Sequence, residues 1–269
     1  MSGFAFGRNW EAYLPLVDEG RVDAAVSSIR SLLGTDSLAG RRFLDVGSGS
    51  GLFSLAARRL GADVTSFDAD PNSVACTKAL RDRFLPSDSA WRIEYGSVLD
   101  RAYLESLGTF DVVYSWGVLH HTGDMWRAMD NVALCLESGG LLALALYNDQ
   151  GWKSRAWCRV KELYNRAPRI AQHLIVLLAG GPLYLRGVLA DLLVRRSGAG
   201  AVGPRRGMNR WRDLVDWVGG FPYQVARPGE VVTFYRDRGL ELWNLNTSNG
   251  RLGCNEFVFR RTWNADEPR

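Results

Sequence analysis

The feature that most constrains the fold is an alternation of short apolar runs with helical stretches, which begins at residue 42 and continues to residue 147. Short apolar runs bounded by turn residues are typical of buried strands. Strands that alternate with helices join through right-handed crossovers, so the pattern predicts a parallel sheet. The strands are expected at residues 43–46, 63–67, 91–95, 110–115 and 141–147. The helices are expected at residues 52–60, 72–84, 100–107 and 125–137, with a stop at Ser138-Gly139-Gly140.

The alternation is interrupted after residue 147 and resumes at residue 228. The intervening segment contains amphipathic and apolar stretches that predict lid helices, followed by a small, glycine-rich, basic loop at residues 197–207. A helix at 228–238 and strands at 240–245 and 256–260 complete the chain. We therefore expect a Rossmann-like, doubly wound α/β sheet, mostly parallel with an antiparallel last strand, plus a helical lid insertion. The expected division is an N-terminal helical cap (1–41), a core (42–147), the lid (148–227) and the end of the core sheet (228–269).

Three glycines, Gly47, Gly49 and Gly51, follow the first strand at alternate positions and precede a helix. A side chain there would keep a ligand away from the backbone, and the helix that follows has free N–H groups. Asp68, at the end of the second strand, is placed to accept hydrogen bonds from ribose hydroxyls. The pattern predicts a site for an adenosine ligand, with an ordinary tight turn as the alternative. A dinucleotide fingerprint would require glycine where Leu52 stands, which disfavours NAD.

These residues resemble the class I S-adenosylmethionine-dependent methyltransferases. The likeness covers residues 42–147 well and the remainder weakly: residues 44–51, 67–70, 95–98 and 110–121 resemble four of the family's motifs. The resemblance implies S-adenosyl-L-methionine as cofactor and S-adenosyl-L-homocysteine as product. Many members have aspartate where this chain has Ser97. The implied cofactor-binding residues are Asp45, Gly47, Ser48, Gly49, Gly51, Asp68, Ala69, Ser97, Val98 and Trp116.

Two adjacent histidines, His120 and His121, end the fourth strand. Imidazole has a pKa suited to taking a proton from a hydroxyl at neutral pH. Many small-molecule O-methyltransferases have two histidines here, so the resemblance implies that one acts as general base; a hydrogen bond to a loop is the alternative. Polar and aromatic residues after the fifth strand and in the lid are expected to contact the acceptor, or else to cap and pack their own elements. These are Tyr147, Asn148, Arg210, Trp211 and Trp217.

The segment from residue 151 to 212 is strongly basic. It holds 13 Lys and Arg against two acids, a net +11, which leaves the rest of the chain at −7. This excess of positive charge indicates an anionic partner: an anionic or amphipathic acceptor, a membrane surface or nucleic acid. A solvated basic surface without a partner is the alternative. The longest uncharged run there, residues 170–185, is shorter than the ~20 residues that span a bilayer. The scattered cysteines and the absence of a secretory signal predict a cytoplasmic protein without a metal site.

The sequence therefore predicts an S-adenosylmethionine-dependent methyltransferase that acts on a small or medium organic acceptor, at oxygen, with histidine-assisted deprotonation. A natural product, a sugar or a quinone- or lipid-like molecule would fit. An RNA methyltransferase that uses the basic segment at 151–212 is the alternative, although the fourth motif lacks the Asn/Asp-Pro-Pro-aromatic signature of base methylation and no RNA-binding module is recognisable. An NAD-dependent oxidoreductase and a non-catalytic cofactor-binding fold are further alternatives.

Overall fold

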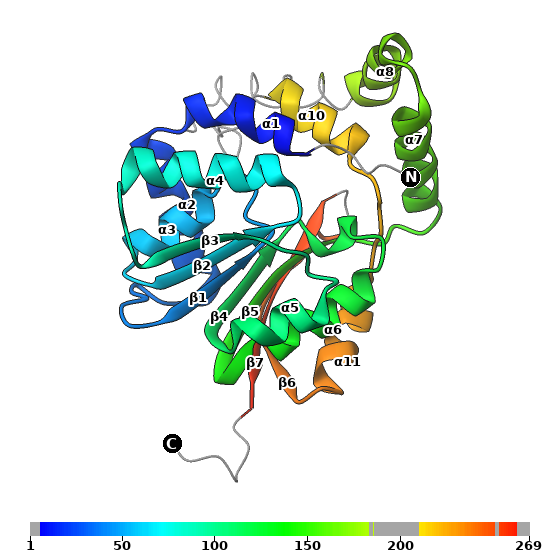
Figure 1. Ribbon diagram of the computed structural model, residues 1–269. Coiled ribbons are helices and arrows are strands. Elements are labelled where there is room, and N and C mark those ends of the chain that lie inside the picture. Colours follow the sequence, from blue (N-terminus) through cyan, green and yellow to red (C-terminus); the bar gives the residue numbers. More distant parts are fainter. Residues whose placement is uncertain (1–5, 183–184, 186–209, 251–252, 263–269) are drawn as a thin grey trace, which may run out of the picture.

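The computed structural model describes residues 6–182, 185, 210–250 and 253–262, which form one seven-stranded sheet covered by helices (Figure 1). The strand order is β3-β2-β1-β4-β5-β7-β6, with β7 antiparallel to both of its neighbours and β1 to β5 parallel. This confirms the predicted Rossmann-like sheet with an antiparallel last strand. The strands are β1 (Arg42–Val46), β2 (Asp63–Asp68), β3 (Trp91–Tyr95), β4 (Phe110–Trp116), β5 (Leu136–Tyr147), β6 (Leu240–Asn246) and β7 (Cys254–Arg261).

Helices cover both faces of the sheet and create two apolar cores. One core lies under α2 (Glu19–Leu33), α3 (Leu52–Arg59) and α4 (Pro71–Phe84). The other lies under α5 (Arg101–Leu107), α6 (Met125–Leu134) and α11 (Pro228–Arg236). Residues 142–146 of β5 are buried without exception, as expected of a central strand that is covered on both faces.

One predicted element boundary is wrong. The helix before β5 ends at Leu134, so Ser138-Gly139-Gly140 lie inside β5 instead of terminating the helix. Leu136 is buried and already pairs with Phe110, and Gly139, at φ +74°, belongs to the irregular part of this ladder. At the N-terminus, η1 (Leu14–Leu16) follows α1 (Phe6–Tyr13), and α2 begins after Asp18, whose carboxylate accepts a hydrogen bond from the backbone N–H of Arg21 and caps the helix.

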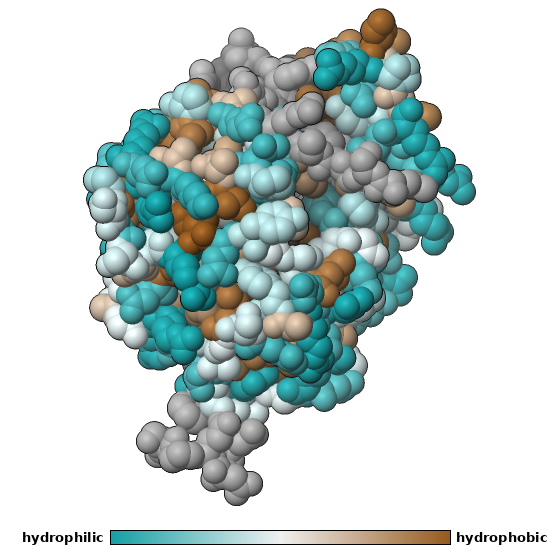
Figure 2. Space-filling view, viewed as in Figure 1, coloured by the Kyte–Doolittle hydropathy of each residue, from teal (hydrophilic) through white to brown (hydrophobic). Residues whose placement is uncertain are grey.

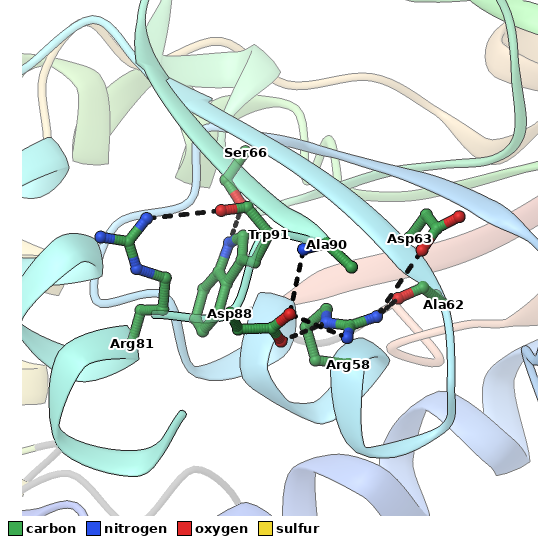
Figure 3. A network of polar contacts seen from close by, with 8 residues as sticks. All are labelled: Arg58, Ala62, Asp63, Ser66, Arg81, Asp88, Ala90 and Trp91. Atoms are coloured by element: carbon green, nitrogen blue, oxygen red, sulfur yellow. Dashed lines mark hydrogen bonds and ion pairs between the residues drawn. The ribbon is translucent and has the colours of Figure 1, made fainter. Parts of the chain in front are cut away.

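A polar network fastens the end of α3 to the start of β3 (Figure 3). Arg58 makes two hydrogen bonds to the Asp88 carboxylate, from Nε at 2.8 Å and Nη2 at 3.1 Å. This paired guanidinium lowers the pKa of Asp88 below its ordinary value. Beside it, the Trp91 indole N–H donates to Ser66 Oγ at 2.8 Å, so the network continues into β2.

The described part of the predicted lid consists of α7 (Trp152–Arg166), α8 (Arg169–Ile175), η3 (Val176–Gly180) and α10 (Arg210–Gly219). These elements share a small apolar core and lie beyond the edge of the sheet where β5 ends. The predicted loop at 197–207 and much of the stretch at 168–196 lie outside the described residues. Within the described part of the chain, no helix has the length and apolar character needed to cross a bilayer.

Candidate active site

The turn between β1 and α3 is shaped by its three glycines. Gly47, Gly49 and Gly51 have φ values of +79°, +55° and +80°, which side-chain-bearing residues rarely adopt. A Cβ at Gly47 would lie 2.5 Å from a methyl group of Val118, and one at Gly49 would lie 2.9 Å from the Trp10 ring. The turn is therefore a backbone surface with no room for side chains, as the spacing predicts.

Asp68 joins the end of β2 to this turn. One of its carboxylate oxygens accepts a hydrogen bond from the Gly49 N–H at 3.0 Å, and the other accepts from the Asp70 N–H at 2.8 Å. Burial raises the pKa of Asp68 to about 6, although these backbone donors oppose the shift. The carboxylate is thus held in one orientation beside the turn, whereas Ala69 is exposed.

Asp45 lies at the end of β1, below the turn and out of contact with water. The Ser54 hydroxyl donates to it at 2.5 Å, Ser54 and Ser66 hydroxyls lie 2.7 Å apart, and Ser66 accepts from the Trp91 indole. Burial raises the pKa of Asp45 to about 7, and the nearby charge of Asp68 adds to the rise. A buried chain of hydrogen bonds therefore connects Asp45, below the glycine turn, to Trp91 on β3.

Other predicted cofactor residues are engaged within the protein. The Ser48 hydroxyl lies 3.0 Å from that of Thr77. Val98 is buried in the core, while Ser97 Oγ accepts from the Leu99 N–H at 3.2 Å. Trp116 donates its indole N–H to a Glu256 carboxylate oxygen on β7 at 3.1 Å. Of these four, only Ser97 and Trp116 are partly exposed.

The N-terminal helix covers the turn. The Trp10 ring lies against Gly49, and the Gly7 N–H donates to Asp70 Oδ2 at 2.9 Å. Asp70 also accepts from the Asn72 N–H at 2.9 Å and caps α4, whose first residue is Pro71. In Figure 1, α1 and α10 lie side by side above the sheet, and they are in contact.

The two histidines belong to η2 (Leu119–His121), directly after β4. His120 is wholly buried, with its ring centroid 4.0 Å from that of Tyr147 and 4.4 Å from that of His121. Nδ1 of His121 lies 2.7 Å from the Pro222 carbonyl oxygen. A carbonyl only accepts, so Nδ1 carries the proton and Nε2 the lone pair. Burial lowers the pKa of His121 to about 3, so its ring is neutral at physiological pH.

Aromatic residues from the lid surround Tyr147. Trp217 and Tyr223 have ring centroids 5.1 Å and 5.2 Å from it. Between these three rings lies the ammonium group of Lys161, a residue that the sequence analysis did not single out. Its sequence signal is helical spacing: Lys161 follows Trp157 by four positions and precedes Tyr164 by three, on the face of α7 that is buried.

The remaining predicted acceptor residues do not all reach this cluster. Asn148 is buried, and its side-chain oxygen accepts a hydrogen bond from Asn255 at 3.1 Å. Arg210 and Trp211 form the first turn of α10, and their side chains lie outside the described part of the structure. Among the described residues, no three His, Cys, Asp or Glu side chains are grouped to hold a metal ion.

A family model described as "Methyltransferase domain" matches residues 19–244. Together with the fold and the glycine turn, this match shows that the chain belongs to the class I S-adenosylmethionine-dependent methyltransferases. Two solved structures share the fold at low identity. Magnesium protoporphyrin IX methyltransferase from Synechocystis PCC 6803, with bound S-adenosylhomocysteine, has a TM-score of 0.53 and 14% identity, over 90% of this chain and 84% of that one. A methyltransferase from Methanosarcina mazei has a TM-score of 0.51 and 16% identity, over 88% and 98%.

Among curated proteins, the chain is similar to enzymes named ubiquinone biosynthesis O-methyltransferase. The one from Sinorhizobium fredii is 32% identical over 111 residues, which are 41% of this chain and 43% of the relative. The one from Xanthomonas oryzae pv. oryzae is 40% identical over 111 residues, which are 41% and 45%. The match thus spans less than half the length of these relatives.

Proposed function

We propose that the protein transfers a methyl group from S-adenosylmethionine to a hydroxyl oxygen of a small or medium-sized organic acceptor. The observation that carries the proposal is that the glycine turn and the two histidines lie close together. Val118 contacts the turn at Gly47 and is only two residues from His120. The names of the curated relatives support oxygen as the atom that is methylated. A natural product, a sugar and a quinone- or lipid-like molecule remain the acceptor classes to be tested.

The residues at the turn fit this cofactor. The turn has backbone without side chains at Gly47, Gly49 and Gly51, and the carboxylate of Asp68, which is held in one orientation, suits the two ribose hydroxyls. Asp45 contributes negative charge, which suits a ligand with a sulfonium and an ammonium group. We assign the adenine-binding stretch to Ser97 and Val98, and the wall beside the methionine part to Trp116.

When bound, S-adenosylmethionine supplies a methyl group on a sulfonium and leaves as the neutral thioether S-adenosylhomocysteine. The lid aromatics exclude water and orient the acceptor. His121 accepts a hydrogen bond from the acceptor hydroxyl at Nε2 and takes its proton, so that the oxygen can attack the methyl carbon. The low pKa of His121 means that it passes this proton on to water and does not retain it.

Calorimetric titration with S-adenosylhomocysteine tests the cofactor assignment. Asp68→Ala should weaken binding by about a hundredfold or more, because each hydrogen bond to a charged group is worth about 1.5–3 kcal/mol. Asp82→Ala, an exposed acid on α4, is the matched control and should bind as the wild type does.

His121→Ala should retain binding but lose transfer of labelled methyl groups to a panel of phenols and alcohols. Tight NADH binding by the wild type, or full turnover by His121→Ala, would contradict the proposal.

The outer surface of the lid supports a second part of the proposal, contact with a membrane surface that carries an amphipathic acceptor. Ile170 and Leu178 are 82% and 78% exposed, and two further exposed residues, Arg166 and Arg169, come just before Ile170 in the chain. Figure 2 shows apolar surface over α8, at the far end of the lid. The cytoplasmic location remains a prediction, and RNA binding through the same basic segment is the alternative.

A further inference from the structure

Lys161 extends from lid helix α7 into the aromatic cluster, and its side chain is wholly buried. Its ammonium nitrogen lies 4.8 Å from the ring centroid of Trp217, 4.9 Å from that of Tyr223 and 5.7 Å from that of Tyr147. The ammonium also donates a hydrogen bond to the backbone carbonyl of Trp217. The charge is therefore held in one place by three rings and a carbonyl oxygen.

Keeping this charge away from water is expensive. A buried ammonium loses its hydration, and replacement of buried charges by apolar residues of similar volume is often neutral or stabilising. The negative faces of three aromatic rings recover part of the loss. An apolar side chain would fill the lid core with a smaller free-energy cost of burial. Packing alone therefore does not account for a lysine at this position.

The charge lies on the side of the site where the proposed function puts the acceptor. Tyr147 contacts the ring of His120 as well as the Lys161 ammonium, and the field of Lys161 helps to lower the pKa of His121. The cofactor side carries the carboxyl groups of Asp45 and Asp68, whose negative forms a bound cationic ligand would favour. This separation matches the reaction, in which a positive sulfonium meets an electron-rich oxygen.

We infer that Lys161 binds the methyl acceptor as an oxyanion, and that the natural acceptor therefore carries an acidic hydroxyl of the phenol or enol type. The inference rests on the proposed function and narrows its substrate class: an aliphatic sugar hydroxyl does not ionise near neutral pH. The ammonium lowers the pKa of the bound hydroxyl, and the proton leaves through Nε2 of His121 to water. A weak base is then sufficient, which is what the neutral His121 provides.

A chromophoric phenol tests this role directly. 4-Nitrocatechol changes its visible absorbance on ionisation, so the pKa of the bound probe is measured by titration with S-adenosylhomocysteine present. The wild type should lower that pKa by at least about one unit, a tenfold shift in ionisation. Lys161→Gln keeps a donor for the Trp217 carbonyl but removes the charge, and should abolish the shift, whereas Lys161→Arg should keep most of it.

Lys153→Gln is the matched control, because Lys153 lies on the same helix and is exposed. It should leave the pKa of the bound probe unchanged. Melting temperature and S-adenosylhomocysteine affinity report whether each variant is folded. If Lys161→Gln does not fold, the wild type alone still tests the inference. It should bind 4-nitrophenol at least about tenfold more tightly than 4-nitrobenzyl alcohol, whose hydroxyl does not ionise.

The inference is overturned if the wild type does not bind the phenols, if it binds the phenol and the alcohol equally, or if the shift persists in Lys161→Gln. Labelled methyl transfer to 4-nitrocatechol separates this result from the proposed function. Transfer without a pKa shift would refute the role of Lys161 alone. A pKa shift without transfer of the methyl group would refute the proposed reaction and leave the binding role in place.

Discussion

At the scale of single residues, the acids of the cofactor site differ from surface acids in how firmly they hold a proton. Burial raises the pKa of Asp45 to about 7 and that of Asp68 to about 6. In the proposed function the ligand's ammonium group lies near these acids, and its charge would favour their ionised forms. The protonation of these two side chains therefore links the pH of the solution to cofactor binding.

This linkage predicts opposite pH trends with and without ligand. In the folded protein Asp45 keeps its proton up to about pH 7, whereas in the unfolded chain it loses it near pH 3.8. The ligand-free protein should thus become less stable as pH rises from about 4 to 7. S-adenosylhomocysteine affinity should fall as pH drops below about 7 through Asp45 and more steeply below about 6 through Asp68, by up to about tenfold per unit for each acid.

Melting temperatures of the ligand-free protein and calorimetric affinities between pH 5 and 8 measure both trends. Asp45→Asn, whose amide oxygen can still accept from Ser54, should weaken the pH dependence of both the melting temperature and the affinity. The exposed Asp82→Asn should leave both unchanged. Identical pH dependence in the wild type and Asp45→Asn would exclude this role for Asp45.

At the scale of elements, helix α1 forms the outer wall of the cofactor turn. Trp10 lies on Gly49, and the Gly7 N–H is bonded to the acid that caps α4. The helix therefore depends on the absence of a side chain at Gly49. Gly34, which ends α2 at φ +67°, offers a comparison because a Cβ there would meet nothing within 4 Å.

Gly49→Ala and Gly34→Ala should both lose stability from the left-handed backbone, by about 1–2 kcal/mol. Only Gly49→Ala should also displace Trp10 and weaken S-adenosylhomocysteine binding, by more than about tenfold. Chemical denaturation and calorimetry measure the two effects separately. Equal affinities in the two variants would show that Trp10 does not form part of the cofactor site.

The sequence predicted the sheet because residues such as 142–146 are apolar throughout, a pattern that central parallel strands require. It did not predict that β5 begins at Leu136, because the polar and glycine residues that follow favour a helix end when tertiary pairing is unknown. The glycine turn and Asp68 could be placed from spacing. Lys161 was missed despite its spacing from Trp157 and Tyr164, because a lysine on an amphipathic helix is normally expected at its solvated face. Asn148 gave no sign of its buried partner Asn255.

At the scale of the whole molecule, charge and apolar surface are unevenly distributed. The lid carries exposed apolar residues at α8 beside basic side chains, while the remainder of the chain is acidic in sum. An apolar face with arginines at its border suits the interface of an anionic lipid layer. This arrangement would bring the lid, and not the cofactor half, to the membrane.

Flotation with phosphatidylglycerol-containing vesicles should therefore recover the wild-type protein, and pure phosphatidylcholine vesicles should recover much less. A double variant with Ile170→Glu and Leu178→Glu should lose most of the binding. Leu16→Glu, which changes an exposed leucine outside the lid, is the matched control. Undiminished flotation of the double variant, or a preference for RNA over vesicles at physiological salt, would contradict membrane contact.

The two ends of the lid segment meet: Asn148 and Ala226 form a parallel bridge, and the Ala226 N–H donates to the Tyr147 carbonyl at 3.0 Å. A segment that leaves and re-enters the domain at neighbouring points is tolerated as an insertion, because the strands on either side keep their places. We therefore expect that the lid can be exchanged as one unit. Descendants of one ancestral enzyme could acquire new acceptors by replacing the lid as a block, while the half that handles the methyl donor is inherited unchanged.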